Sequence, residues 1–548
     1  MEKQDLEFWG NIVDVIGQRI FKGVIVVRNS KIIAIREEDN NESCFILPGL
    51  IDAHIHIESS MLVPSEFARL AVVHGTIGSV SDPHEIANIL GVEGIRFMIQ
   101  NGSEVPFKFY FGASSCVPAT GFETAGAKIG LAELDELLQS EDVLYLSEMM
   151  NFPGVIYDDE EVAQKLALAK KYRKPIDGHA PGLRGEDVKK YIGAGISTDH
   201  ECYTLEEAIE KISHGMKILI REGSAAKNFE DLSPLIQQYP DKVMLCSDDK
   251  HPNDLASGHI NELVKRAFDL GYDKMKVLRT ATYNPIKHYN LQAGLLQKGD
   301  AADFIIVDEL KTFNVLATYV NGRKVAENGK SLISPVKVIS VNKFHANPIK
   351  KEDIVLKPAG KKIRVIKATD GQIVTGELIC DATVRDNEVT TDLENDVLKI
   401  VVVNRYTPAS LAVGFVHGFG LKSGAIASSI AHDSHNIIAV GTNDKSIVDA
   451  INSIVSSQGG IAVVSEDGLD MLRLPVAGIM SDQDGYQVAK QYDGMDKLVR
   501  TKLKSELSAP FMTLSFMALL VIPDLKLSDK GLFDGKKFSF ISLFEKLF

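Results

Sequence analysis

Two histidines stand one residue apart at the end of an aliphatic run, Ile46 to Ile55. On a β-strand, residues i and i+2 point to the same face, so His54 and His56 can direct two imidazoles at one point. Neutral imidazoles are good ligands for a first-row divalent metal. A His-X-His pair also occurs by chance as ordinary polar residues at a strand end. The other residues of the chain must therefore decide between these two interpretations.

Further residues of ligand or acid–base type follow other apolar runs of the chain. They are Asp82, His84, Glu85, Glu148, His179, His200, Asp248 and Asp249. Random placement does not favour this arrangement, because the whole chain contains only 14 histidines. Imidazole nitrogens and carboxylate oxygens without a thiolate suit Mn, Fe or Zn. The pattern predicts a metal centre, although no single member of the set would do so alone.

These residues follow eight predicted strands in the middle of the chain, and helical stretches separate the later strands. The strands are Leu50–Ile55, Thr76–Ser81, Phe107–Gly112, Val143–Ser147, Pro175–Gly178, Ile196–Asp199, Met216–Arg221 and Lys242–Ser247. Strand–helix alternation predicts an α/β protein with a parallel sheet, and eight units predict a (β/α)8 barrel. An open doubly wound sheet is the alternative. A barrel places catalytic groups at the carboxyl ends of its strands, where these residues occur.

The remaining sequence predicts two further domains around the barrel, which we place at residues 46–298. Residues 1–45 and 299–334 both contain short β-rich runs joined by turns. They predict one small β-sandwich domain built from both flanks. Residues 335–548 combine apolar runs with Gly-rich and Ser-rich links, and predict an α+β C-terminal domain.

Composition limits the partners and the compartment. The chain has 548 residues, 45% of them hydrophobic, and a formal net charge of −14, which argues against nucleic acid as a partner. Residues 1–10 contain no secretory signal. The most apolar stretch, Ala509 to Pro523, is too short to span a membrane comfortably. The five cysteines are scattered and form no C-x-x-C pair, so we expect reduced thiols in a cytoplasmic protein.

With these motifs the chain resembles the amidohydrolase superfamily and, more narrowly, the bacterial adenine deaminases. The phrases that carry the resemblance are Pro48–Ser60, Asp82–Asn88, Asp177–Pro181, Thr198–Glu201, Ser247–Asp249 and Ala509–Phe516. The resemblance extends over nearly the whole chain. Many superfamily members bridge two metals with a carboxylated lysine after the fourth strand. This chain has Glu148 there. A glutamate can bridge two metals without modification, and the adenine deaminase branch resembles that arrangement.

The resemblance implies a binuclear site with two divalent ions per subunit, Mn²⁺ or Fe²⁺, with Zn²⁺ as a possibility. The implied ligands are His54, His56 and Asp248 for one ion, His179 and His200 for the other, and Glu148 between them. The alternative is that Glu148 is a buried, paired carboxylate beside a single ion. Asp248 and Asp249 are adjacent and would point to opposite sides of a strand, so at least one should face away from the metal. Either could be the ligand, and the superfamily pattern favours Asp248.

The resemblance also implies hydrolysis of adenine to hypoxanthine and ammonia, a reaction of purine salvage. A metal-bound hydroxide would attack C6, and Asp248 would pass the water proton to the leaving amine. Glu85 would protonate a ring nitrogen, with His84 as a second electrophilic or hydrogen-bonding group. Asp249 would accept a hydrogen bond from a purine N–H. Helix capping after Pro83 is the alternative role for His84 and Glu85.

Two rival functions stay open on the sequence alone. One is another amidohydrolase reaction, such as cyclic amide hydrolysis or N-acetyl sugar deacetylation. The other is a metal-stabilised binding or scaffold protein without turnover. The histidines of the His432-Asp433-Ser434-His435 segment fit either a second metal site or a loop with polar caps, and the resemblance suggests that this domain closes over the barrel mouth. We expect a homodimer or a higher homo-oligomer.

Overall fold

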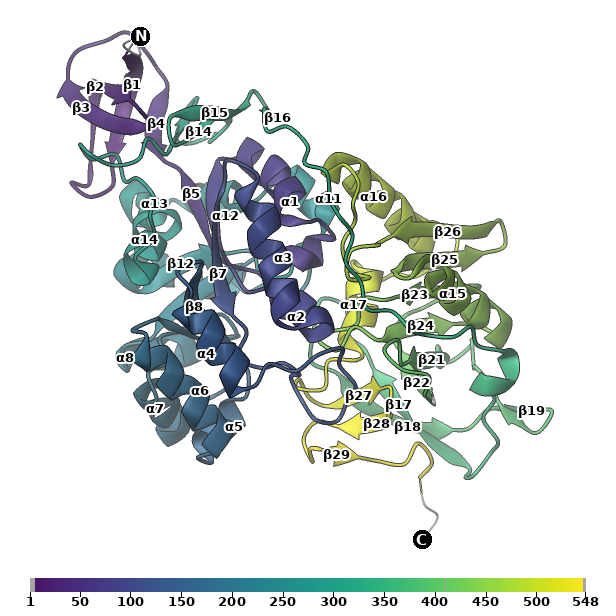
Figure 1. Cartoon of the computed structure of the whole chain (residues 1–548). Coiled ribbons are helices and arrows are strands. Elements are labelled where there is room, and N and C mark those ends of the chain that lie inside the picture. The colour runs from purple at the N-terminus through teal and green to yellow at the C-terminus, as the bar shows by residue number, and fades with distance from the viewer. Residues whose placement is uncertain (1–4, 410, 546–548) are drawn as a thin grey trace.

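The computed structural model describes residues 5–409 and 411–545. Figure 1 shows a small β-structure at the N-terminal end of the molecule, a central region of strands and helices, and a C-terminal region beyond it. The segment after β16 (Lys330–Ser331) runs from the small β-structure across the central region into the C-terminal region.

The central region contains eight parallel strands in two hydrogen-bonded sheets. The first sheet has the order β5 (Leu50–Ile55), β6 (Thr76–Ser81), β7 (Lys108–Ala113), β8 (Val143–Met149) and β9 (Ile176–Gly178). The second has the order β10 (Thr198–Asp199), β11 (Lys217–Arg221) and β12 (Val243–Cys246). All eight strands predicted from the sequence form, each within two residues of its expected bounds. Every residue of β5 and β6 is buried, the polar ones included, as expected for parallel strands covered on both faces.

The two central sheets meet at both of their edges. Between β9 and β10, the backbone N–H of Ser197 donates to the carbonyl of Ile176 at 3.0 Å. Between β12 and β5, the N–H of Asp248 donates to the carbonyl of His54 at 3.0 Å. The side chain of Asp52 strengthens this second contact by accepting from the N–H of Ser247 at 3.0 Å. The contacts bring the carboxyl ends of β5 and β12 together.

Helices connect and cover these strands. They are α1 (Pro64–Ala71), α2 (His84–Leu90), α3 (Val92–Ser103), α4 (Leu131–Gln139), α5 (Phe152–Ile156), α6 (Glu160–Lys171), α7 (Gly185–Gly193), α8 (Leu205–Ser213), α9 (Phe229–Leu232), α10 (Leu235–Gln238), α11 (Pro252–Ser257), α12 (Ile260–Asp269), α13 (Lys274–Ala281) and α14 (Tyr283–Tyr289). They are amphipathic. In α12, for example, Leu263, Val264 and Ala267 are buried while the charged positions face outward.

Strands from both flanks of the central region form one eight-stranded sheet. In order along the sheet they are β16, β15 (Arg323–Glu327), β14 (Val315–Val320), β13 (Phe304–Val307), β4 (Phe45–Pro48), β1 (Leu6–Asp14), β2 (Arg19–Arg28) and β3 (Lys31–Glu37). The sheet is continuous and folds over itself. The ring of Phe8 in β1 lies 4.8 Å from that of Phe304 and 5.0 Å from that of Tyr319, although β4 separates β1 from β13 in the sheet.

The C-terminal region is built on a second eight-stranded sheet. Its order is β18 (Gly376–Asp381), β17 (Lys362–Lys367), β22 (Ala412–His417), β21 (Leu398–Val403), β24 (Ile437–Gly441), β23 (Ala425–Ser428), β25 (Gly460–Ser465) and β26 (Gly468–Arg473). A hairpin, β19 (Val384–Arg385) and β20 (Glu388–Val389), and a small sheet, β27 (Leu525–Ser528), β28 (Gly531–Asp534) and β29 (Ser539–Phe540), accompany it. Three helices complete it, α15 (Asp444–Ser457), α16 (Gly485–Thr501) and α17 (Pro510–Phe516). The apolar side of α15, with Ile447, Ile451 and Ile454, packs against β23, β24 and β25.

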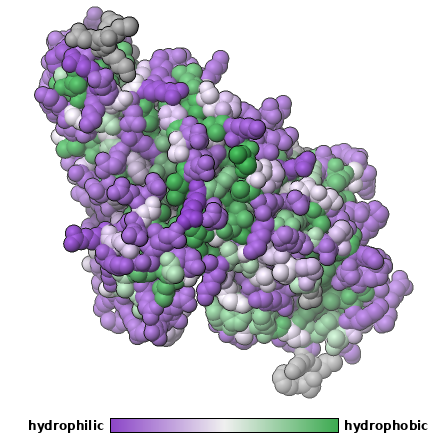
Figure 2. Space-filling model, viewed as in Figure 1, coloured by the Kyte–Doolittle hydropathy of each residue, from purple (hydrophilic) through white to green (hydrophobic). Residues whose placement is uncertain are grey.

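The C-terminal region is docked on the central region through buried contacts. Arg69 of α1 binds Oδ2 of Asp484 at 2.7 Å, and Glu66 accepts the N–H of Gly485 at 2.8 Å. Tyr492 of α16 is hydrogen bonded to Nδ1 of His251 at 2.6 Å. Figure 2 shows a mainly hydrophilic face, with hydrophobic residues gathered toward the middle of the view.

The apolar stretch that contains α17 is a buried element, as expected. Every residue of α17 is buried, and in Figure 1 the helix lies between the central region and the C-terminal sheet. Over the described residues, none of the helices has both the length and the apolar character needed to cross a membrane.

Candidate metal and substrate site

His54 and His56 are buried at the end of β5 and face the same point, as the strand alternation predicted. Their Nε2 atoms lie 3.3 Å apart, and each lies near Oδ1 of Asp248, at 3.4 Å and 3.3 Å. Asp248 follows β12 and has a φ of 54°, so the chain has already left the extended conformation. Strand alternation therefore does not govern Asp248 and Asp249. Asp248 faces the two histidines, whereas Asp249 lies farther along the cavity.

Glu148, near the end of β8, connects the two groups of histidines. Its Oε1 lies 3.4 Å from Nε2 of His56. Its Oε2 lies 2.9 Å from Nδ1 of His179 and 3.2 Å from Nε2 of His200. The ring of His200 also stacks on that of His54, with 4.2 Å between the centroids. One carboxylate thus connects histidines from the ends of three different strands, β5, β9 and β10.

These side chains fit a divalent-metal site. The three donor atoms of His54, His56 and Asp248 lie within 4.8 Å of one another, as do those of His54, Glu148 and His200. All are buried nitrogen and oxygen donors, which suits Mn, Fe or Zn. Burial alone would lower the pKa of His56, but the carboxylates of Asp248 and Glu148 raise it well above its usual value. The acids therefore make this part of the molecule favourable for positive charge.

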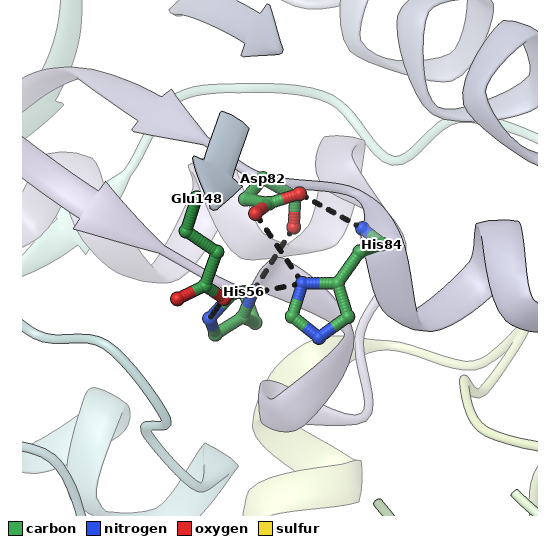
Figure 3. Close-up of side chains that lie close together, drawn as sticks. All are labelled: His56, Asp82, His84 and Glu148. Carbon is green, nitrogen blue, oxygen red and sulfur yellow. Dashed lines mark hydrogen bonds and ion pairs between the residues drawn. The ribbon is translucent and has the colours of Figure 1, made fainter. Parts of the chain in front are cut away.

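His84 lies beside this cluster, at the start of α2. Its Nδ1 is 3.3 Å from Oδ2 of Asp82 and 3.3 Å from Oε1 of Glu148, and Figure 3 shows these side chains with His56 gathered around one point. These four residues form another group with metal-binding spacing. Asp82 also accepts the backbone N–H of His84 at 3.1 Å, so the carboxylate fixes the start of the helix.

Glu85 is held by two histidines of the C-terminal region. Its Oε1 lies 3.1 Å from Nε2 of His432, and its Oε2 is hydrogen bonded to Nε2 of His435. The Nδ1 of His435 accepts the backbone N–H of Ala431 at 3.4 Å, so Nε2 is the atom that donates to Glu85. Burial alone would raise the pKa of Glu85, but His432, His435 and His84 lower it well below its usual value. The three histidines therefore favour the ionised form of Glu85.

Asp249 lies on the other side of His432. Its Oδ1 accepts a hydrogen bond from Oγ of Ser59 at 2.5 Å and lies 3.7 Å from Nε2 of His432. Burial opposes ionisation of Asp249 and the neighbouring Asp248 carboxylate adds to that effect, but His432 leaves its pKa below the usual value. Glu85 and Asp249 are thus two charged acceptors at one end of the cavity.

The candidate site opens into a narrow cavity, with about 40 Å³ of free space for water-sized molecules. One wall carries the histidines and acids described above. The apolar wall is formed by Met150, Ala226, Ile373, Phe516, Leu519 and Val521. Ile373 and the last three residues belong to the C-terminal region, so both regions build the cavity.

The structure brings together all the predicted site residues and adds others. The additions are Glu201, Arg221, His432, His435 and Ser515. Arg221 ends a predicted strand, so the rule that selected the other residues also applied to it. Its Nη1 donates to Oδ2 of Asp248 at 2.7 Å, and its guanidinium also binds Glu201. His417, which ends β22 in the C-terminal region, is absent from the cavity lining.

Comparisons with known proteins agree across the whole chain. Residues 45–325 match the amidohydrolase family, and residues 372–539 match the adenine deaminase C-terminal domain. The adenine deaminase of Sulfurovum sp. (strain NBC37-1) is 56% identical over 536 residues, covering 98% of this chain and 99% of that protein. The adenine deaminase of Methanosarcina mazei is 54% identical over 551 residues, with 98% and 99% covered. That of Borreliella burgdorferi is 46% identical, with 97% and 98% covered.

Proposed function

This chain belongs to the adenine deaminase family of the amidohydrolases, and from that premise we propose that its buried site hydrolyses adenine to hypoxanthine and ammonia. The observation that carries the assignment to these residues is the convergence of His54, His56, His179 and His200 on the carboxylates of Glu148 and Asp248. The role of each residue in the reaction, developed below, is our proposal.

We propose that the site holds two divalent ions, Mn²⁺ or Fe²⁺ in preference to Zn²⁺. His54, His56 and Asp248 would hold one, and His179 and His200 the other, with Glu148 shared by its two oxygens. Bound there, such ions lower the pKa of a water toward ~7 and stabilise negative charge on the reacting ring. The close contact of His84 with Glu148 supports a role for His84 at the edge of this cluster.

Asp248 is suited to move protons because its two oxygens have different partners. Oδ2 accepts from Arg221 at 2.7 Å, which fixes the plane of the carboxylate. Oδ1 faces the histidines and is the atom that would take a proton from the attacking water. We propose that the same oxygen then delivers this proton to the amine that leaves C6. Arg221 favours the ionised form of Asp248, the form that accepts the proton in the first transfer.

Glu85 and Asp249 are suited to contact the purine ring. A purine has ring nitrogens that accept hydrogen bonds and an N–H that donates one, so binding requires both polarities. The two carboxylates supply acceptors for the N–H, and Nε2 of His432 lies 3.1 Å from Oε1 of Glu85. The apolar wall, which includes Phe516 and Leu519, supplies the flat face on which a heterocycle packs. We propose that Glu85 exchanges a proton with a ring nitrogen while C6 changes geometry.

The larger architecture completes the proposal. We propose that β5 to β12 form a closed (β/α)8 barrel, because both edges of the two parallel sheets meet. The proposed domains are residues 46–298 for the barrel, 1–45 with 299–334 for the small β domain, and 335–548 for the C-terminal domain.

The five cysteines are all free, which supports a reducing compartment such as the cytoplasm. Assembly as a homodimer or larger homo-oligomer stays a prediction, which light scattering would test.

Ammonia release from adenine tests the function. Metal-free protein is reconstituted with Mn²⁺, Fe²⁺ or Zn²⁺, the ions bound per subunit are counted, and ammonia and hypoxanthine are measured. We expect equal amounts of both products and two ions per subunit. A hydantoin and an N-acetylated sugar serve as control substrates and should give no product. Absence of ammonia with every metal would exclude the deaminase function, and one ion at full activity would remove Glu148 from its bridging role.

A further inference from the structure

We propose that His432 is a positioning residue of the active site, supplied by the C-terminal domain: anchored by Ser515, its Nε2–H lies between Glu85 and Asp249 and holds both carboxylates in place for the purine. The proposal rests on the proposed function, because it concerns the same cavity. It assigns a role in the reaction to a domain that lies outside the barrel.

The first observation is the anchor of the imidazole. His432 lies between β23 and β24, and Ser515 lies on α17. Oγ of Ser515 accepts the backbone N–H of His432 at 3.1 Å and lies 2.5 Å from Nδ1 of the same residue. The second lone pair of Oγ can accept a hydrogen bond from Nδ1–H of the charged imidazole. In this charged form Nε2, the nitrogen that faces the cavity, carries a proton as well.

The second observation is the direction of that nitrogen. Nε2 of His432 lies 3.1 Å from Oε1 of Glu85 and 3.7 Å from Oδ1 of Asp249. It is buried, and it has no well-aligned hydrogen bond to either carboxylate. One donor thus stands between two acceptors without being committed to one of them. Such a donor can form a hydrogen bond with either carboxylate as the purine binds and as charge moves in the ring.

The third observation separates His432 from its neighbour His435. His435 binds Oε2 of Glu85 and does not line the cavity. His432 lines the cavity and contacts the other oxygen, Oε1. The two histidines therefore act differently: His435 anchors Glu85 to the C-terminal domain, and His432 sets the position and charge of the oxygen nearest the substrate. Burial disfavours the charged form of His432, but Glu85 and Asp249 raise its pKa well above the usual value.

The main experiment compares three variants in the metal-loaded full-length protein. His432→Ala removes the donor, His432→Gln keeps an N–H donor, and Ser515→Ala frees the imidazole. We expect His432→Ala to lower kcat/KM by about 100-fold, His432→Gln to recover part of the loss, and Ser515→Ala to fall between wild type and His432→Ala. Metal content should stay at the wild-type value in all three. His345→Ala, an exposed histidine of the same domain, is the matched control and should leave kcat/KM unchanged.

The pH profile separates positioning from simple structural support. Removing His432 takes a cationic partner from Glu85, so the pKa of Glu85 rises and the acid limb of kcat/KM moves to higher pH. A purely structural residue would lower activity without moving this limb. Activity of His432→Ala within threefold of wild type with an unmoved acid limb would overturn the proposal. Equal loss in the Ala and Gln variants, accompanied by loss of metal, would overturn it as well.

A measurement that needs no turnover keeps the proposal distinct from the proposed function. Protein labelled with ¹⁵N-histidine reports which imidazole nitrogen carries the proton, and the signal missing in His432→Ala identifies His432. We expect protonated Nε2 in wild type and a clear shift of this signal in Glu85→Gln. If wild type fails to deaminate adenine but this shift appears, the function is wrong and the coupling of His432 to Glu85 stands. If the ¹⁵N signal of His432 is the same in Glu85→Gln as in wild type, the proposed coupling of His432 to Glu85 is wrong, whatever the substrate is.

Discussion

Nη1 of Arg221 donates to Oδ2 of Asp248 at 2.7 Å, and this contact determines which oxygen of Asp248 faces His54 and His56. The same guanidinium binds both oxygens of Glu201, and all three side chains are buried. A planar guanidinium with several donors suits this task better than an ammonium group would. Arg221 is therefore the link between the end of β11 and the proton-carrying residue that follows β12.

Replacement of Arg221 by Ala should unfold the protein more easily and reduce its activity. Two buried carboxylates would lose their guanidinium partner, and breaking a buried ion pair in this way costs about 3–5 kcal/mol. Urea denaturation measures the loss, and metal analysis shows whether Asp248 still contributes to the site. Arg184→Ala, which breaks an exposed pair with Glu210, is the control and should change neither quantity. Wild-type stability of Arg221→Ala would contradict the assigned role.

Glu148→Gln should lower the number of bound ions and the turnover together. The amide keeps the size of the side chain but removes the charge shared by His56, His179 and His200. We expect activity to fall by more than the ~10- to 100-fold typical for loss of an outer-shell partner of a metal. Elemental analysis of the purified variant measures the ions. The exposed Glu141→Gln controls for the substitution itself. Two ions per subunit in Glu148→Gln would show that the bridge is not needed.

Glu85→Gln, unlike Glu148→Gln, should leave the number of bound ions unchanged. Glu85 contacts His84, His432 and His435 and lies outside the proposed ligand set. We therefore expect wild-type metal content and a loss of turnover of ~100-fold or more, the size usual for an acid–base group. Steady-state kinetics together with metal counting makes the test. Undiminished turnover would remove Glu85 from the reaction.

The stability of the protein should fall between pH 7 and pH 5 partly because of His74. Burial, with the nearby His259 and Lys250, lowers the pKa of His74 to about 4. An unfolded histidine has a pKa near 6.5, so below that pH the unfolded state binds the extra proton and is favoured. The contribution at pH 5 is about 1–2 kcal/mol.

Denaturation of His74→Gln at both pH values measures this contribution. The variant should lose less stability than wild type on going from pH 7 to pH 5. His345→Gln, at an exposed position, should lose as much as wild type. An unchanged pH difference in His74→Gln would show that another group carries the effect.

How much of this site was predictable from the sequence depends on how far apart its parts lie. The strand ends at His56, Glu148 and His200 follow from local apolar runs and from the rule that barrels place chemistry at carboxyl ends. Arg221 obeys the same rule and could have been included. The mutual position of Asp248 and Asp249 could not, because the left-handed backbone at Asp248 breaks the strand alternation that the prediction assumed.

The C-terminal part of the site lay beyond such reasoning. The histidines of the 432–435 segment stand out in the sequence, but their spacing fits a loop with polar caps as well as a metal site. Only the docking of β23, β24 and α17 on the central region directs them at Glu85. That docking depends on the packing of many side chains, such as the contact of Arg69 with Asp484. Residue types and local spacing do not predict this docking.

The hydrogen bond between Glu85 and His435 joins residues that are 350 positions apart, and this separation matters on the ribosome. At ~5–20 residues per second, roughly 20–70 s pass between the synthesis of the two partners. During that interval the nascent chain can already contain all the proposed metal ligands of the barrel. The residues of α17, which contribute to the apolar wall of the cavity, have not yet been translated. The cavity wall formed by Phe516, Leu519 and Val521 is therefore completed only near the end of translation.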